Sequence, residues 1–173
     1  RGYAVVDEEF HPRYQARSRT YRYFLCRTLL NVEEMNRAAR YFEGTHDFSA
    51  FARVEGRNPM RTLHCVRVKQ DGPRVMVEVT GESFLWHMVR GIVSFLESVG
   101  EGRSTAESVT TLLDHPTDQR IPAAPPEGLA LWEVDCGIPF TPLPLEERHR
   151  RSLLDIHRRH CVMEEITGQF LGR

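Results

Sequence analysis

Aromatic and basic side chains alternate in one segment of the sequence, residues 11–27. The segment holds five arginines and no acidic residue, with three tyrosines and one phenylalanine among them. Guanidinium groups bind phosphates through paired hydrogen bonds, and tyrosine rings stack on nucleobases with a gain of about 1–3 kcal/mol per base. A tyrosine hydroxyl can also transfer a proton. The pattern predicts a nucleic-acid-binding strand with Tyr21 and Tyr23 on one face, although both can equally be ordinary sheet residues.

A single arginine, Arg90, lies within an apolar run at residues 84–99. Apolar residues occupy most of the circumference that this run has as a helix, so the helix must be largely buried. A buried guanidinium without an anionic partner is strongly unfavourable. Arg90 therefore needs an anion, which is either a local carboxylate such as Glu97 or a catalytic or substrate anion that the arginine holds.

Two other groups of ionisable residues carry weaker signals. His46 and Asp47 follow a glycine and are more typical of a turn or a helix cap than of an acid–base pair. His157, His160 and Cys161 have loose metal-ligand spacing, but a structural zinc site needs four ligands and no convincing fourth is present. We expect no metal and no cofactor, with a metal-dependent enzyme centred on these three residues as an alternative.

The elements that must position these residues follow from periodicity and capping signals. Strands are predicted over residues 17–27, 62–70, 74–80 and 129–134, with a hairpin turn at Asp71-Gly72-Pro73. Helices are predicted over residues 32–42 with Asn31 as N-cap, over 84–99 with Ser83 as cap, from a Ser104/Glu107 capping box to about 114, and over 145–165. Residues 46–59 are predicted to form a loop.

This order of elements predicts an α+β fold, in which helices pack on one face of an antiparallel or mixed sheet. The other face is expected to be free for a ligand. We expect residues 1–138 to form one domain and residues 139–173 to form a proline-rich linker and a basic helical extension. The candidates for the docking face of that last helix are Leu153, Leu154, Ile156 and His157.

Composition excludes several classes of protein. The chain has 173 residues, which suffice for a hydrophobic core, and it has no run of the roughly 20 apolar residues that cross a membrane. Four cysteines without a CxxC pair fit reduced thiols, and we expect a cytoplasmic protein. The net charge of −1 conceals an asymmetry: residues 91–147 carry 2 bases and 10 acids, whereas residues 1–61 carry 11 bases and 8 acids.

Five ordered segments resemble the TruA-type tRNA pseudouridine synthases. They are FHPRY at 10–14, RTYRY at 19–23, GTHDFSAF at 44–51, RNPMRT at 57–62 and FLWHMVR at 84–90. The later PEGLAL at 126–131 is similar to the closing strand of that family. The resemblance covers about residues 3–136, which corresponds to the C-terminal half of a family member.

The resemblance implies a reaction, a substrate and a set of site residues. The family isomerises uridine to pseudouridine in the anticodon stem-loop of tRNA without a cofactor or a metal, and it works as a homodimer. By resemblance, Tyr21 packs on the target base and assists removal of the C5 proton, and Arg90 pairs with the nucleophilic aspartate. The residues implied to contact tRNA are Phe10, His11, Arg13, Tyr14, Arg19, Arg53, Arg57 and Arg61.

One motif of the family is missing from the sequence. The nucleophile of the family is the aspartate of an Arg-Thr-Asp-x-Gly-Val-His segment, but the Arg-Thr pairs here are followed by Tyr21, Leu29 and Leu63. We therefore expect that the chain is the C-terminal half of a longer enzyme and is inactive alone. The alternative is a stand-alone RNA-binding module, which uses the same aromatic and basic residues and gives Arg90 no special role.

Overall fold

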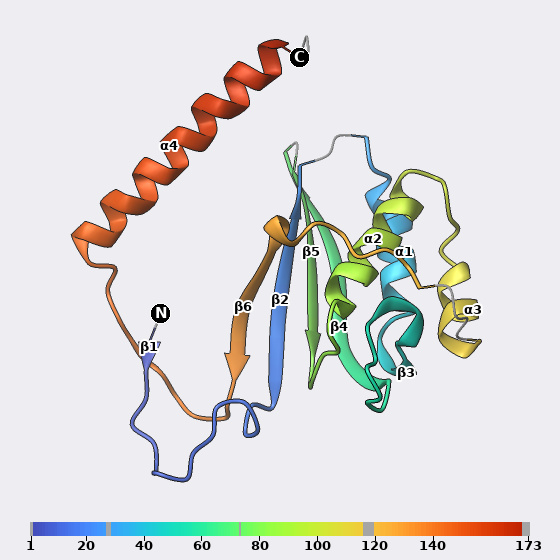
Figure 1. Ribbon diagram of the computed structural model, residues 1–173, viewed down its shortest axis with the longest axis horizontal. Coiled ribbons are helices and arrows are strands. Elements are labelled where there is room, and N and C mark those ends of the chain that lie inside the picture. Colours follow the sequence, from blue (N-terminus) through green and yellow to red (C-terminus); the bar gives the residue numbers. More distant parts are fainter. Residues whose placement is uncertain (1, 27–28, 73, 116–119, 171–173) are drawn as a thin grey trace. The chain divides into compact units, whose positions relative to one another are not determined.

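The computed structural model describes residues 2–26, 29–72, 74–115 and 120–170 (Figure 1). Contacts divide the chain into two compact units. Residues 11–137 form one, here called the sheet unit, and residues 1–10 together with 138–173 form the other, here called the tail unit. Every residue assigned to catalysis or tRNA contact except Phe10 belongs to the sheet unit.

The sheet unit contains a five-stranded antiparallel sheet. Its strands in spatial order are β3 (Gly44–Asp47), β4 (Met60–Asp71), β5 (Arg74–Gly81), β2 (Ser18–Leu25) and β6 (Leu129–Asp135). Strands β4 and β5 form the predicted hairpin, in which Asp71 pairs with Arg74. The predicted strands are confirmed. The last residue of the predicted strand 17–27, Arg27, and the last residue of the predicted turn, Pro73, lie outside the described residues.

Helices cover one face of this sheet (Figure 1). Helix α1 (Val32–Arg40) packs on β4 and on α2 (Met88–Gly100), and the short α3 (Ser108–Asp114) follows α2. The Asn31 side chain accepts a hydrogen bond of 3.1 Å from the backbone N–H of Glu34, so the predicted N-cap is confirmed. The α+β class, with helices packed on an antiparallel sheet, is confirmed as well.

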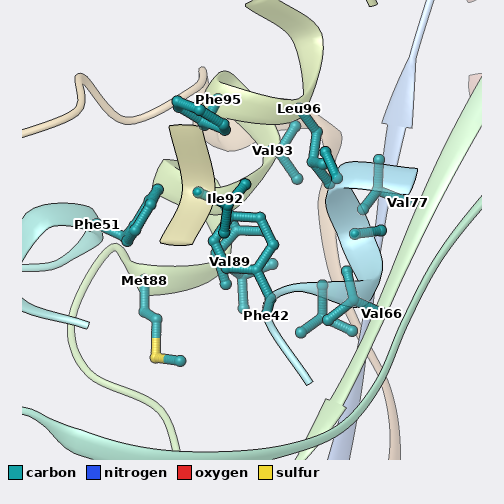
Figure 2. Close-up of a cluster of buried hydrophobic side chains, with 14 of the residues drawn as sticks. Phe42, Phe51, Val66, Val77, Met88, Val89, Ile92, Val93, Phe95 and Leu96 are labelled. Carbon is teal, nitrogen blue, oxygen red and sulfur yellow. The ribbon is translucent and has the colours of Figure 1, made fainter. Parts of the chain in front are cut away.

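The core between the sheet and the helices is rich in phenylalanine (Figure 2). The ring of Phe42 lies 5.0 Å from that of Phe51 and 6.4 Å from that of Phe95, in edge-on contacts. Gly91 allows α2 to approach this cluster closely, because a Cβ atom at position 91 would collide with the carbonyl oxygen of Phe51. This close packing fixes the first turn of α2, which carries Arg90.

The helix predicted from residue 84 begins later, at Met88. Residues 84–87 form an irregular segment, in which the carbonyl of Trp86 accepts a hydrogen bond of 2.9 Å from the backbone N–H of Arg53. His87 adopts a left-handed conformation with φ of 66°, which an α-helix does not accommodate. The predicted start and the Ser83 cap are wrong, because a bridge to a distant loop orders this segment in place of helical hydrogen bonds.

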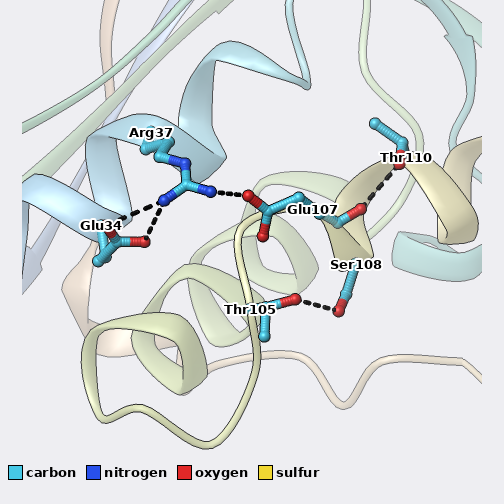
Figure 3. Close-up of polar contacts among 6 residues, drawn as sticks. All are labelled: Glu34, Arg37, Thr105, Glu107, Ser108 and Thr110. Carbon is cyan, nitrogen blue, oxygen red and sulfur yellow. Dashed lines mark hydrogen bonds and ion pairs between the residues drawn. The ribbon is translucent and has the colours of Figure 1, made fainter.

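The capping box predicted at Ser104 and Glu107 is also wrong. The Ser104 hydroxyl bonds the Ser98 hydroxyl at 2.9 Å, and α3 begins only at Ser108. The Glu107 carboxylate forms an ion pair with Arg37 on α1, and Arg37 also contacts Glu34 at 3.3 Å (Figure 3). The neighbouring helix therefore holds the carboxylate that the prediction assigned to the cap.

The loop predicted over residues 46–59 contains regular structure at its start. Strand β3 extends to Asp47, and a short 3₁₀ helix, η1 (Ser49–Phe51), follows it. The Asp47 carboxylate accepts a hydrogen bond of 2.8 Å from the backbone N–H of Ser49, and His46 Nε2 contacts the Glu43 carbonyl oxygen at 2.8 Å. The interpretation of His46 and Asp47 as turn residues is wrong, because both belong to β3, where they pair with β4; only the Asp47 carboxylate acts like a cap, on the backbone N–H of Ser49.

The tail unit contains a two-stranded pairing and one long helix. Strand β1 (Gly2–Tyr3) pairs with β7 (Thr141–Pro142), and α4 (Glu147–Phe170) is the predicted basic helix. No residue of α4 is buried, so Leu153, Leu154, Ile156 and His157 all face solvent. In the part of the chain that the structure describes, no helix has the length and apolar character needed to cross a membrane.

Candidate active site

A cavity of about 300 Å³ opens at the start of α2, and we call it the Arg90 pocket. It is formed by β2, by the segment before α2, by the first turn of α2 and by the turn η2 (Pro126–Gly128) with the start of β6. Its lining residues are Tyr21, Phe84, Leu85, Trp86, His87, Met88, Val89, Arg90, Pro126 and Leu129. The two residues that the sequence analysis assigned to catalysis, Tyr21 and Arg90, therefore meet in one cavity.

The Arg90 side chain is half-buried in this pocket and is held from one side. Its Nε donates a hydrogen bond of 2.5 Å to the carbonyl oxygen of Ala124, whose own N–H donates to the Arg90 carbonyl at 3.0 Å. None of the ion pairs among the described residues includes Arg90, so the pair with Glu97 that the sequence offered as one alternative is not among them. The charge of Arg90 is therefore available to an anion that enters the pocket.

The two tyrosines of β2 have different environments. Tyr23 is 3% exposed, and its hydroxyl donates a hydrogen bond of 2.8 Å to the Pro125 carbonyl. Burial, and next the charge of Glu97, raise the pKa of Tyr23 above its ordinary value. Tyr21 is half-buried, contacts Phe84 edge-on at 5.0 Å, and makes no hydroxyl hydrogen bond to any other described residue. Tyr23 is a core residue, whereas Tyr21 is free to meet a ligand.

A second cavity of about 350 Å³ shares Tyr21 and Phe84 with the Arg90 pocket, and we call it the arginine pocket. Its lining residues are Arg13, Tyr14, Arg19, Tyr21, Arg57, Arg61, Ser83 and Phe84. Six of the ten residues assigned to catalysis or tRNA contact thus line one cavity, and Tyr21 and Phe84 also line the Arg90 pocket. The structure places the predicted aromatic and basic residues around two adjacent cavities.

The remaining candidates lie elsewhere. Phe10 belongs to the tail unit, and the His11 ring contacts that of Tyr14 at 4.4 Å at the edge of the arginine pocket. Arg53 lines neither cavity but holds Trp86 through the backbone. Sequence reasoning missed Phe84 and Trp86 as pocket residues, because it placed both inside a helix. The Trp86 side chain is 57% exposed, which is high for a large apolar ring. Exposure of this kind is a property of the folded structure, so the sequence alone gives no signal of it.

Charge at the mouth of the Arg90 pocket acts on His87. Burial, then the positive charges of Arg90 and Arg53, lower the pKa of His87 below its ordinary value. His87 is therefore neutral at neutral pH. In the unfolded chain the His87 imidazole becomes protonated near pH 6.5, whereas in the folded chain it becomes protonated only at lower pH. The free energy of unfolding therefore decreases as the pH falls through this interval.

We expect the imidazole of His87 to titrate below pH 6.5 in an NMR titration of the chain, and Arg53→Gln to raise its midpoint. Arg67→Gln, on the exposed part of β4, is the matched control and leaves the midpoint unchanged. A midpoint at or above 6.5 in the unmodified chain contradicts this electrostatic description.

A family model for tRNA pseudouridine synthase matches residues 38–135 of this chain. The chain belongs to the tRNA pseudouridine synthase family. It is 49% identical over 167 residues to tRNA pseudouridine synthase A of Methanoculleus marisnigri and 40% identical over 173 residues to that of Thermococcus kodakarensis. These alignments cover 96% and 98% of this chain but only 62% and 65% of the two relatives, so the chain spans less than two thirds of their length.

The tRNA pseudouridine synthase model covers Arg57, Arg61 and Arg90, whereas Tyr21 and Arg19 lie before its first matched residue. Both pockets therefore combine residues inside and outside the matched region.

The candidate metal ligands do not assemble: His157 and Cys161 approach to 3.6 Å, but within the described ranges no three His, Cys, Asp or Glu side chains converge on a metal position. The family resemblance expected from the five sequence motifs is confirmed.

Proposed function

We propose that this domain supplies one wall of the active site of a tRNA pseudouridine synthase, with a flipped-out uridine in the Arg90 pocket. The observation that carries the proposal is that Tyr21 and Arg90 line the same cavity while no described carboxylate pairs with Arg90. An enzyme that works on a base inside an RNA helix or loop must extrude that base into a pocket. A pocket lined by aromatic rings and an arginine suits an uncharged uracil ring and an anionic nucleophile.

In the proposed reaction, Arg90 holds the carboxylate of an aspartate that belongs to a segment outside this sequence. The N1–C1′ bond of the uridine breaks, the base turns, and a bond forms between C5 and C1′. The proton on C5 leaves and N1 gains a proton, so atoms and electrons balance without an oxidant or a reductant. Tyr21 stacks on the ring, and its hydroxyl assists the departure of the C5 proton.

The finer assignments rest on the resemblance of the five motifs. We propose that the substrate is the anticodon stem-loop of tRNA and that the enzyme works as a cytoplasmic homodimer without a cofactor. The arginine pocket supports the RNA part of this proposal, because guanidinium groups that carry no carboxylate are suited to the phosphate backbone.

The test compares the 173-residue chain alone with the same chain fused to an N-terminal half that carries the Arg-Thr-Asp motif. Pseudouridine formation in tRNA is measured by release of the C5 hydrogen isotope. We expect conversion by the fusion and none by the chain alone. If the chain alone converts uridine, the proposal that the nucleophilic aspartate comes from a segment outside this sequence is wrong. A fusion that binds tRNA without converting uridine favours a non-catalytic RNA-binding module.

A further inference from the structure

The arginine pocket concentrates positive charge without a balancing acid. Arg13, Arg19, Arg57 and Arg61 converge on it, and none of them takes part in an ion pair among the described residues. Elsewhere in the sheet unit, arginines do find carboxylates, as Arg22 does with Glu78 at 2.7 Å. Four guanidinium groups repel one another, so their convergence is unfavourable until an anion joins them.

Backbone carbonyls hold two of these guanidinium groups in place. The Nη atoms of Arg19 donate to the carbonyls of Glu82 (2.9 Å) and Arg13 (2.5 Å). Arg61 Nη1 donates to the carbonyls of Asn58 (2.8 Å) and Met60 (2.6 Å). Carbonyl oxygens orient an arginine without neutralising it, so the pocket is preorganised for an anion and keeps its full charge.

Arg61 also retains an unused donor. Its Nε is buried and has no hydrogen-bond partner among the described residues. Burial, and next the charge of Arg57, lower the pKa of Arg61. A buried N–H without a partner is costly, and an anion that enters beside Arg57 and Arg61 would relieve both the missing hydrogen bond and the repulsion.

We propose that the arginine pocket binds one backbone phosphate of the RNA, next to the nucleotide whose base enters the Arg90 pocket. This inference rests on the proposed function, because it places the two ligand groups on one RNA strand. Tyr21 and Phe84 line both cavities, so a base in one and a phosphate in the other would contact the same pair of rings.

The test measures binding of the 173-residue chain to a short single-stranded RNA that contains one uridine, at several salt concentrations and without turnover. The comparison RNA carries uncharged methylphosphonates in place of the phosphates on either side of the uridine. We expect the uncharged links to weaken binding about ten-fold. We also expect the slope of log affinity against log salt to fall by about 0.7 for each bound phosphate whose charge is removed.

Arg57→Gln is expected to reproduce the loss of affinity for the phosphate-containing RNA and to leave binding of the methylphosphonate RNA unchanged. Arg57 is exposed, so the variant keeps the fold. Arg67→Gln removes an equally exposed arginine outside the pocket and is expected to have no effect. Equal losses for the two variants, or equal affinity for an oligoglutamate of the same charge, would overturn the phosphate site.

The two proposals can fail separately. If the chain binds RNA in a phosphate-dependent way but the fusion is inactive, the catalytic proposal is overturned and the phosphate site stands. An active fusion that binds both RNAs equally overturns the phosphate site alone.

Discussion

Arg90→Gln lowers the turnover of uridine by the fused enzyme by a factor of about 10² to 10³ and leaves its affinity for tRNA within about two-fold. Removal of one partner from a fully buried ion pair costs about 3–5 kcal/mol, and each 1.36 kcal/mol corresponds to one factor of ten in rate. Because Arg90 is half-buried, the lower part of this range applies. The Arg90 side chain makes only one hydrogen bond among the described residues, from Nε to Ala124, so its Nη groups remain for the nucleophilic carboxylate. The measurement is the single-turnover rate with saturating enzyme.

The pH profile separates this role from a merely structural one. Without Arg90 the pKa of the partner carboxyl group rises, so the acidic limb of the pH–rate profile moves to higher pH. Arg90→Lys keeps the charge but loses the planar pair of donors, and we expect a smaller loss of rate with a smaller shift of that limb. An unchanged pH profile together with a loss of thermal stability contradicts the ion-pair role.

Tyr21→Phe lowers turnover by a factor of about 10² and changes RNA affinity by less than about two-fold, because a positioned acid or base typically contributes about 10²–10⁴ in rate. The phenylalanine ring still stacks on the base, and the hydroxyl that is lost makes no hydrogen bond to the described residues. Tyr21→Ala also removes the stacking, which contributes about 1–3 kcal/mol per base, so it weakens RNA binding by a further factor of about 5 to 150.

Tyr23→Phe is the matched control, since it removes a hydroxyl two positions along the same strand. That hydroxyl bonds the Pro125 carbonyl inside the fold, so the expected effect is a loss of about 1 kcal/mol in the free energy of unfolding with an unchanged rate. Equal losses of rate and RNA affinity in Tyr21→Phe contradict the proton-transfer role. Both variants are measured in the fused enzyme by isotope release and by titration with labelled tRNA.

Local signals in the sequence predicted most of the fold. Asn31 caps α1, the Asp71-Gly72 turn joins β4 to β5, and the alternation of β2 puts Tyr21 and Tyr23 on one face. The start of α2 could not be predicted in this way. Residues 84–87 are apolar enough to continue a helix, and only the long-range bridge between Arg53 and Trp86 shows that they do not.

The candidate site was predicted residue by residue, but its assembly was not. Alternation treats Tyr21 and Tyr23 alike, whereas the close approach of η2 covers only Tyr23: a Cβ atom on Gly128 would lie 2.7 Å from the Tyr23 ring. The arginines of the arginine pocket come from a loop, from β2, from the β3–β4 connection and from β4, so their convergence depends on tertiary packing. Sequence patterns identify such residues without showing that they face a common ligand.

The bridge between Arg53 and Trp86 ties together the two parts of the chain that serve the two cavities. Arg53 begins the stretch that carries Arg57 and Arg61, and Trp86 precedes the turn of α2 that carries Arg90. With base and phosphate bound as proposed, this backbone link joins the segment that holds the phosphate to the segment that holds the base, so neither wall can move without the other.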